Sequence, residues 1–282
     1  MENSTIAILM ATYNGEKFLK EQIESILAQT NQNWHLYIHD DGSKDNTMSI
    51  IKSYTNEFSD KITLLDYPSQ GGACQNFLSL LERIEASYYM FCDQDDVWLP
   101  EKIELSRKEM ERQERDFPDK AIVICSDLFV VDEKLAVIHD SMWRYHRIFP
   151  QYIKTFNDSA ANPVATGCTM IFNHKAKESN SPYTADVMMH DCWICLCALK
   201  QKGILVGINQ QLVYYRQHGK NSLGIGVKAS DIGFLYRIKH FMRIYRFNRD
   251  YYKMLSILDY GSVFKFVRYK FKYRQRIKRG YY

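Results

Sequence analysis

The chain has 282 residues, of which 46% are hydrophobic and 25% are charged. This length and balance predict one large α/β domain, or one domain with a short appendage, and they argue against long disordered stretches. The first residues lack the basic start of a signal peptide, and no apolar run reaches the roughly 18 residues that span a bilayer. We therefore expect a cytoplasmic protein.

The net charge of +4 is unevenly distributed along the chain. Residues 228–282 contain 15 Lys and Arg against 3 Asp, a net charge of about +12, so residues 1–227 carry about −8. This asymmetry predicts an α/β domain over residues 1–227 and a second functional region over residues 228–282. The seven cysteines are irregularly spaced and form no paired CxxC motifs, which favours reduced core thiols over disulfides or a zinc site.

Strand and helix patterns alternate over the first 130 residues. The expected strands are 5–10, 34–39, 61–66, 88–92 and 121–131. The expected helices between them span 15–29, then 43 or 45 to about 54, then a segment opened by Gly71-Gly72, and finally 100 to about 117. This alternation predicts a doubly wound, mostly parallel sheet, in which ligands bind beyond the carboxyl ends of the strands.

The second half of the domain is less regular from about residue 141 to 182. It contains a small-residue stretch, 165–169, that suits close approach of a ligand to the backbone. A helix over 191–202 is expected next, followed by two separate strands, 204–208 and 211–215. A polar loop then begins at Arg216.

A cluster of three carboxylates, Asp93, Asp95 and Asp96, follows the strand expected at 88–92. Such acids repel one another unless a cation neutralises them, and Mg²⁺ or Mn²⁺ prefers oxygen ligands and substrate phosphates. The cluster therefore predicts a metal site. The alternative is a solvated acidic turn in which Asp96 caps the following helix.

Other polar residues also follow strands. Asp40 and Asp41 can accept hydrogen bonds from a base or ribose, or can simply form a turn with Gly42-Ser43. Tyr13 is a candidate for stacking on a nucleobase, and an ordinary surface or core tyrosine is the alternative.

Two further candidates lie later in the chain. Asp191 is a candidate general base, although Asp at a helix start is often only an N-cap. His218 is a candidate metal or phosphate ligand, although an isolated histidine is more often structural.

Taken in order, the strings at 11–15 (ATYNG), 40–43 (DDGS) and 93–98 (DQDDVW) resemble the family 2 glycosyltransferases of GT-A fold. The resemblance covers about residues 4–225. Two later strings, 190–193 (HDCW) and 215–221 (YRQHGKN), are similar to the bacterial rhamnosyltransferase-like branch of that family.

The resemblance implies a role for each matching residue. Ala11 and Tyr13 border the nucleobase, Asp40 or Asp41 hydrogen-bonds it, and Asp93 lies near the ribose. Asp95 coordinates the metal on the diphosphate, with His218 as a further candidate ligand. Asp191 matches the second acid of a Glu-Asp base motif whose first position is here His190. The Gln-x-x-Arg-Trp motif of processive synthases is missing.

The implied enzyme is an inverting, Mg²⁺- or Mn²⁺-dependent glycosyltransferase that acts on a lipid-linked or cell-surface glycan, with rhamnose from dTDP-rhamnose as the preferred donor sugar. A sugar-phosphate nucleotidyltransferase is a weaker alternative, because its Gly-rich N-terminal loop with a following Arg and Lys is missing. A non-catalytic sugar-nucleotide sensor is opposed by the intact acids Asp93, Asp95 and Asp191. A dehydrogenase is disfavoured because no GxGxxG follows the first strand.

The C-terminal region combines aromatic and basic stripes. One helical stripe is Phe234, Ile238, Phe241 and Tyr245, and the other is basic, with Arg243, Arg246, Arg249 and Lys253. This pattern favours an anionic membrane surface as partner, which implies a peripheral protein on the inner face of the cell membrane. Packing on the domain or an oligomer contact comes second, and nucleic acid is the least favoured partner. The oligomeric state stays open.

Overall fold

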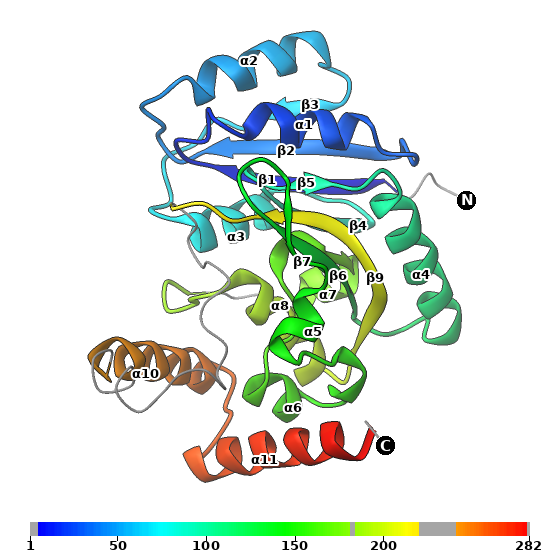
Figure 1. The fold of residues 1–282 in the computed structure, drawn as a ribbon, viewed down its shortest axis with the longest axis vertical. Helices are drawn as coiled ribbons and strands as arrows, with labels where there is room; N and C mark the ends of the chain where they lie inside the picture. Colours follow the sequence, from blue (N-terminus) through cyan, green and yellow to red (C-terminus); the bar gives the residue numbers. More distant parts are fainter. Residues whose placement is uncertain (1–4, 181–183, 220–240, 281–282) are drawn as a thin grey trace.

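This computed structural model describes residues 5–180, 184–219 and 241–280. The fold is built around a single mixed β-sheet. Within the described residues the strand order is β3-β2-β1-β4-β8-β6-β9-β5, and β7 pairs with β6. Helices cover both faces of the sheet (Figure 1). The expected α/β architecture, a doubly wound and mostly parallel sheet with helices at the C-terminus, is confirmed.

The N-terminal half of the sheet is entirely parallel. It consists of β1 (Ile6–Thr12), β2 (Trp34–Asp40), β3 (Ile62–Leu64) and β4 (Tyr88–Asp93). Strand β1 is almost completely buried because it lies at the centre of this half and is covered on both faces. Its register places Thr12 beside Asp40 and Ala11 beside Asp93. The polar residues that follow β1, β2 and β4 therefore meet at one edge of the sheet.

The second half of the sheet mixes directions. It contains β8 (Met170–Asn173), β6 (Ile122–Val131), β9 (Ile204–Arg216), β5 (Val97–Trp98) and β7 (Val137–His139). Strand β8 lies antiparallel between β4 and β6, inside the stretch expected to be irregular. The two strands expected at 204–208 and 211–215 are wrong as separate elements. They form one strand, β9, because its pairing with β6 continues through a register shift at Ser126 and Asp127.

Three helices cover one face of the sheet, namely α1 (Leu19–Leu27), α2 (Thr47–Glu57) and α4 (Lys102–Asp116). The other face is covered by α3 (Ala73–Arg83) and α8 (His190–Lys200). Helix α8 is buried on all sides from Cys192 to Leu199, as its continuous apolar sequence requires. The smaller helices are α5 (Met142–His146), η1 (Pro150–Tyr152), α6 (Phe156–Ala161), η2 (Gly167–Thr169) and α7 (His174–Ser179).

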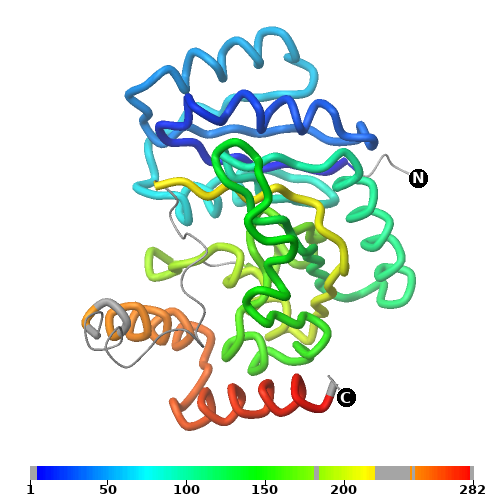
Figure 2. The backbone as a smooth tube through the Cα atoms, in the orientation of Figure 1, coloured from blue at the N-terminus to red at the C-terminus, as the bar shows by residue number. Residues whose placement is uncertain are grey.

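Two C-terminal helices, α10 (Phe241–Ile257) and α11 (Val263–Gly280), pack on this body. Helix α10 shares a core cluster with α8, and α11 lies against α6 and η1 (Figures 1 and 2). Phe234, Ile238 and the end of the polar loop at Lys220 and Asn221 lie outside the described residues. No helix in the described part of the chain is long and apolar enough to cross a membrane.

All seven cysteines are free thiols. Six of them are buried, and Cys74 is half-buried. Burial raises the pKa of the Cys74 thiol to about 12 and also raises that of the Cys195 thiol. These groups therefore behave as core residues in this fold.

Candidate active site

A cleft of about 1010 Å³ opens where β1, β2 and β4 end. This is the edge at which open α/β sheets bind their ligands. Six of the residues predicted for the site line the cleft, namely Ala11, Tyr13, Asp41, Asp93, Asp95 and His218. Asp40 and Asp191 are not among the lining residues. Asp40 accepts from the Ser43 amide, and Asp191 accepts from the Gly167 amide.

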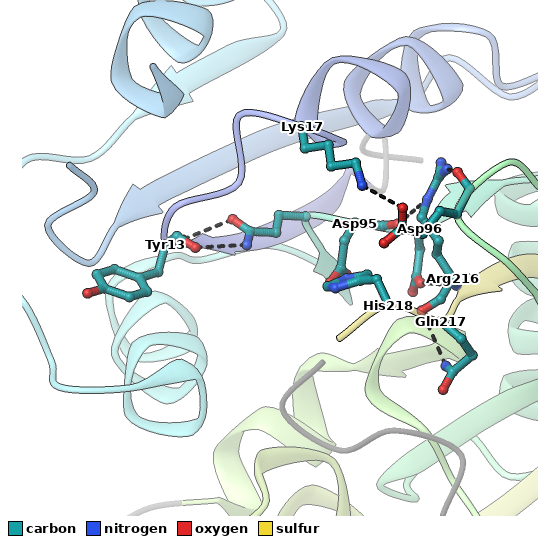
Figure 3. Close-up of polar contacts among 9 residues, drawn as sticks. Tyr13, Lys17, Asp95, Asp96, Arg216, Gln217 and His218 are labelled. Atoms are coloured by element: carbon teal, nitrogen blue, oxygen red, sulfur yellow. Dashed lines mark hydrogen bonds and ion pairs between the residues drawn. The ribbon is translucent and has the colours of Figure 1, made fainter. Parts of the chain in front are cut away.

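Tyr13 lies at one end of the cleft, with its side chain 54% exposed. The Gln94 side chain fixes its backbone by accepting from the Tyr13 amide (2.9 Å) and donating to the Tyr13 carbonyl (3.0 Å) (Figure 3). Gly15 leaves room for this contact, because a Cβ there would come 2.3 Å from Gln94 Oε1. The phenol ring is thus presented on a fixed backbone.

The two adjacent acids after β2 differ in what they hold. Asp40 stabilises its own turn, since it accepts from the Ser43 amide (2.7 Å) and from Thr12 Oγ1 (2.9 Å). Asp41 faces the cleft and accepts from the Gln70 and Gly72 amides at 2.5 and 2.8 Å. These bonds outweigh the effect of burial and lower the pKa of Asp41. A ligand contact for Asp40 stays a prediction, while the position of Asp41 suits one directly.

Asp93 is close to both of the other acids of the site, Asp95 and Asp191. Burial raises the pKa of Asp93 to about 7, and the charges of Asp95 and then Asp191 contribute to the rise. Asp191, almost a hundred residues further along the chain, is therefore close enough to act on the end of β4. The sequence brings these carboxylates together only through the fold.

Asp95 and His218 form a pair at the opposite end of the cleft from Tyr13 (Figure 3). His218 Nε2 lies 2.8 Å from Asp95 Oδ2. The imidazole also packs against the Phe18 ring, with ring centroids 5.1 Å apart. The two residues proposed as metal ligands thus come from β-strand ends that are far apart in sequence.

Arg216 is an important residue whose role the sequence did not reveal. Its side chain is buried and donates from Nε to the Asp95 carbonyl (2.9 Å) and from Nη1 to the Glu133 carbonyl (2.5 Å). It also forms an ion pair with Glu21 and lies over the Phe18 ring. Arg216 therefore joins the Asp95 loop to α1, to the β6–β7 turn and to β9.

Asp96 is not the cap of helix α4. Its side chain is fully buried, and Oδ1 accepts from the Arg216 amide at 3.1 Å. The N-cap residue of α4 is Glu101, which makes no capping bond with its side chain. The acidic-turn alternative is therefore wrong for Asp96, because its carboxylate is buried against β9 and is not solvated.

Asp191 lies in the first turn of α8, but it is not the N-cap, which is Met189. Its carboxylate accepts from the Gly167 amide (3.1 Å) and from the Cys192 amide (2.6 Å). The neighbouring His190 ring stacks on Phe77 and fits against Gly167, where a Cβ would come 2.7 Å from Nε2. Burial lowers the pKa of His190, so its ring is neutral beside the Asp191 carboxylate.

The cleft is lined by donor types that suit a hard divalent cation, although among the described residues the possible ligand atoms that lie within 4.8 Å of one another are those of Asp93, Asp96 and Cys168. Asp93 and Asp95 supply carboxylate oxygens, and His218 supplies an imidazole nitrogen. Burial is the largest cause of the raised pKa of Asp93, and repulsion by the charges of Asp95 and Asp191 raises it further. A cation held there would relieve that repulsion.

A parallel half-sheet, joined to mixed strands and carrying an acidic loop at its edge, is the arrangement of the GT-A class of glycosyltransferases. The sequence pattern of glycosyl transferase family 2 matches residues 7–179. The chain belongs to this family.

Several named relatives support the same class. The chain is 38% identical over 98 residues to the dTDP-rhamnosyl transferase RfbG of Shigella flexneri, across 33% of this chain and 34% of that one. It is 35% identical over 106 residues to WfgD of Escherichia coli, a UDP-Glc:alpha-D-GlcNAc-diphosphoundecaprenol beta-1,3-glucosyltransferase, across 37% and 40% of the two chains. The matches thus span little more than a third of these relatives.

A solved structure shares the fold. The mannosyltransferase PcManGT from Pyrobaculum calidifontis, in complex with GDP-Man and Mn²⁺, aligns over 77% of this chain and 58% of its own with a TM-score of 0.59. Its sequence identity is 14%, so the likeness concerns the fold.

Proposed function

We propose that this enzyme transfers a sugar from a nucleotide donor to a hydroxyl of a glycan acceptor, with inversion at the anomeric carbon. One observation carries the proposal. Asp93 and Asp95, at and just after the end of β4, and His218 after β9 line one cleft, and Asp191 at the start of α8 is close enough to raise the pKa of Asp93.

We place the nucleotide-sugar donor along that cleft, with the nucleobase at the Tyr13 end. Tyr13 and Ala11 border the nucleobase, and Asp41 accepts a hydrogen bond from it while Asp40 holds the turn. Asp93 lies near the ribose. Asp95 and His218 would hold Mg²⁺ or Mn²⁺ against the diphosphate, where the ion supplies stabilisation of the charge that develops on the leaving group.

Asp191 is the proposed general base. It removes the proton of the acceptor hydroxyl while that oxygen forms a bond to the anomeric carbon. The bond from the anomeric carbon to the donor phosphate oxygen breaks on the opposite face, and the nucleoside diphosphate leaves with the electron pair. The Gly167 and Cys192 amides hold the Asp191 carboxylate in one orientation for this step.

The donor and acceptor follow from the relatives as further proposals. The name of the Shigella relative supports dTDP-rhamnose as donor, and that of the Escherichia relative supports a diphosphate-lipid-linked acceptor. We propose on this basis a lipid-linked or cell-surface glycan acceptor. An enzyme that acts on such an acceptor works at the inner surface of the cell membrane, with residues 228–282 as the contact with anionic lipid.

A thermal-shift screen tests the donor site. dTDP-rhamnose, UDP-glucose, UDP-GlcNAc and GDP-mannose are each added with Mn²⁺, Mg²⁺ or EDTA. A ligand that binds the native state at about 100 times its Kd stabilises it by about 2.7 kcal/mol, so the correct donor gives a clear rise in Tm.

The metal dependence of that rise has its own control. Asp95→Asn should remove the difference between Mn²⁺ and EDTA and leave the Tm of the ligand-free protein nearly unchanged, because Asp95 is close to the surface of the cleft. If no nucleotide sugar stabilises the enzyme with any metal, the proposed function is wrong.

A further inference from the structure

Helix α11 (Val263–Gly280) is strongly basic along its whole length. Its 18 residues include eight Lys and Arg and no Asp or Glu. Helix α4 provides a contrast within the same chain. There, Arg107 pairs with Glu111 and Arg112 pairs with Glu109 on the same helix. The charge of α4 is thus balanced locally, whereas α11 carries an excess.

The inward face of α11 is fixed to the body of the protein. The buried Tyr273 hydroxyl accepts from the Phe149 amide at 2.8 Å. Arg276 donates to the Tyr152 carbonyl (2.8 Å) and forms an ion pair with the buried Asp158 (2.9 Å). These contacts set the rotation of the helix about its axis, so its outward face is defined by the structure.

That outward face carries a line of apolar side chains. Phe264 is 88% exposed, Val267 is 46% exposed and Phe271 is 59% exposed. Spacings of three and four residues place them in a row along one side of a helix. A scattered exposed apolar residue is ordinary, but a row of three on a helix whose other face is already packed indicates a contact surface.

Cations flank the row on both sides. The Lys270 ammonium lies 4.8 Å from the Phe266 ring centroid, and the Lys272 ammonium lies 4.7 Å from that of Tyr269. Phe266 and Tyr269 belong to opposite flanks of the inward face, so these two lysines lie on opposite sides of the apolar row. Exposed Arg268 and Arg274 add a charge to each flank.

This arrangement suits a bilayer interface better than other partners. Aromatic side chains insert at headgroup depth, while flanking Lys and Arg extend their stems and reach anionic headgroups. A second copy of the chain would bring cations against cations. A nucleic acid would use the charges but has no need of a continuous apolar row.

We propose that the outward face of α11 lies in the plane of an anionic membrane, with Phe264, Val267 and Phe271 inserted and the flanking cations on acidic lipid. The proposal deepens the proposed function by naming the surface through which the enzyme reaches a membrane-bound acceptor. It assigns membrane contact to one face of one helix, which lies at the end of the molecule away from α2 (Figures 1 and 2).

Vesicle flotation of the full-length protein tests this face. The vesicles are phosphatidylcholine alone or phosphatidylcholine mixed with phosphatidylglycerol, at low and high salt. We expect binding to the mixed vesicles that weakens with salt. The double variant Phe264→Ser/Phe271→Ser should bind them at least tenfold more weakly, since each aromatic side chain contributes roughly 1.4 kcal/mol or more when removed from water.

Phe117→Ser is the matched control, because Phe117 is an exposed aromatic residue at the end of α4, 43% exposed. It should bind as the wild type does. The proposal is overturned if the double variant binds mixed vesicles as the wild type does, or if the control loses binding equally. It is also overturned if neutral vesicles are bound equally well, or if the double variant loses a dimer and keeps vesicle binding. The nucleotide-induced rise in Tm should persist in the double variant. That rise reports on the cleft separately, so failure of the membrane proposal is distinguishable from failure of the proposed function.

Discussion

The cleft and the outward face of α11 both concentrate charge of one sign, but they hold it differently. In the cleft, charged groups are fixed by particular atoms, as Asp95 is by His218 and Asp41 is by the Gly72 amide. On α11, exposed cations such as Arg268 repeat along an apolar row. Charged side chains held in one position suit a ligand of one geometry. Exposed charges repeated along a helix suit the mobile headgroups of a membrane surface. Substitutions that keep charge should therefore damage the first region and spare the second.

The largest expected effect is at the proposed general base. Asp191→Asn keeps the size of the side chain but removes its basicity, so kcat should fall by about 10²–10⁴-fold. Donor affinity should change little. Steady-state kinetics with nucleotide-diphosphate release measures kcat, and titration calorimetry measures donor binding. Near-wild-type turnover would show that another group accepts the proton.

A pair of Arg→Lys substitutions compares the two regions directly. Arg216→Lys keeps the charge but loses the planar fork that binds the Asp95 and Glu133 carbonyls. We expect Mn²⁺ affinity in the presence of nucleotide to fall by about 10–100-fold, as for other groups that orient metal ligands. Calorimetry measures this for variants whose circular dichroism shows a folded protein.

Arg268→Lys is the counterpart on α11 and should change neither Mn²⁺ affinity nor vesicle binding, because only its charge is used. Glu21→Gln, which loosens Arg216 from α1 while leaving both carbonyl bonds, should have an intermediate effect on Mn²⁺ affinity. Equal behaviour of the two Arg→Lys variants would erase the distinction between the regions.

The burial of Asp93 among other acids should lower the free energy of unfolding of the metal-free protein. The pKa of Asp93 is raised from 3.8 to about 7, so the folded protein without metal loses stability as pH rises between those values. Asp93→Asn removes this cost and should stabilise the metal-free protein by about 4 kcal/mol above pH 7, with no gain below about pH 4. Urea unfolding in EDTA across this pH range gives the difference, and a pH-independent gain would contradict this origin.

The smallest expected effect belongs to a single charge on α11. Arg268→Gln should weaken binding to anionic vesicles by about 1 kcal/mol, or roughly fivefold, at low ionic strength. Lys108→Gln on α4 is the control and should leave vesicle binding unchanged. A loss from Arg268→Gln that persisted at high salt would indicate a specific bond in place of diffuse attraction.

Much of the fold could be predicted because its strands are short apolar runs bounded by polar turns, as β1 and β4 are. The start of α1 could not. The helix is expected to begin at residue 15 and begins at Leu19, because the Gly15 and Glu16 amides donate to the side chains of Thr47 and Asp45 between β2 and α2. Strand β8 has only four residues, and the irregularity in β9 exists only through its pairing with β6.

The acids of the site were visible in the sequence because they are clustered, whereas the residue that organises them was not. Asp93, Asp95 and Asp96 follow one strand directly, which marks them without any tertiary information. Arg216 is a single cation whose partners on Glu133, Asp95 and Glu21 lie 83, 121 and 195 residues away. Long-range partners of this kind leave no local pattern in a single sequence.

The late position of Arg216 has a consequence for biosynthesis. During translation the ribosome delivers all the carboxylates of the 93–96 loop long before it delivers the arginine that anchors them. A nascent chain that ends before β9 is complete would present its acids on an unanchored loop. If the cleft binds a divalent ion as proposed, ion capture should appear abruptly in a series of stalled chains, once residues 216–218 have emerged from the exit tunnel.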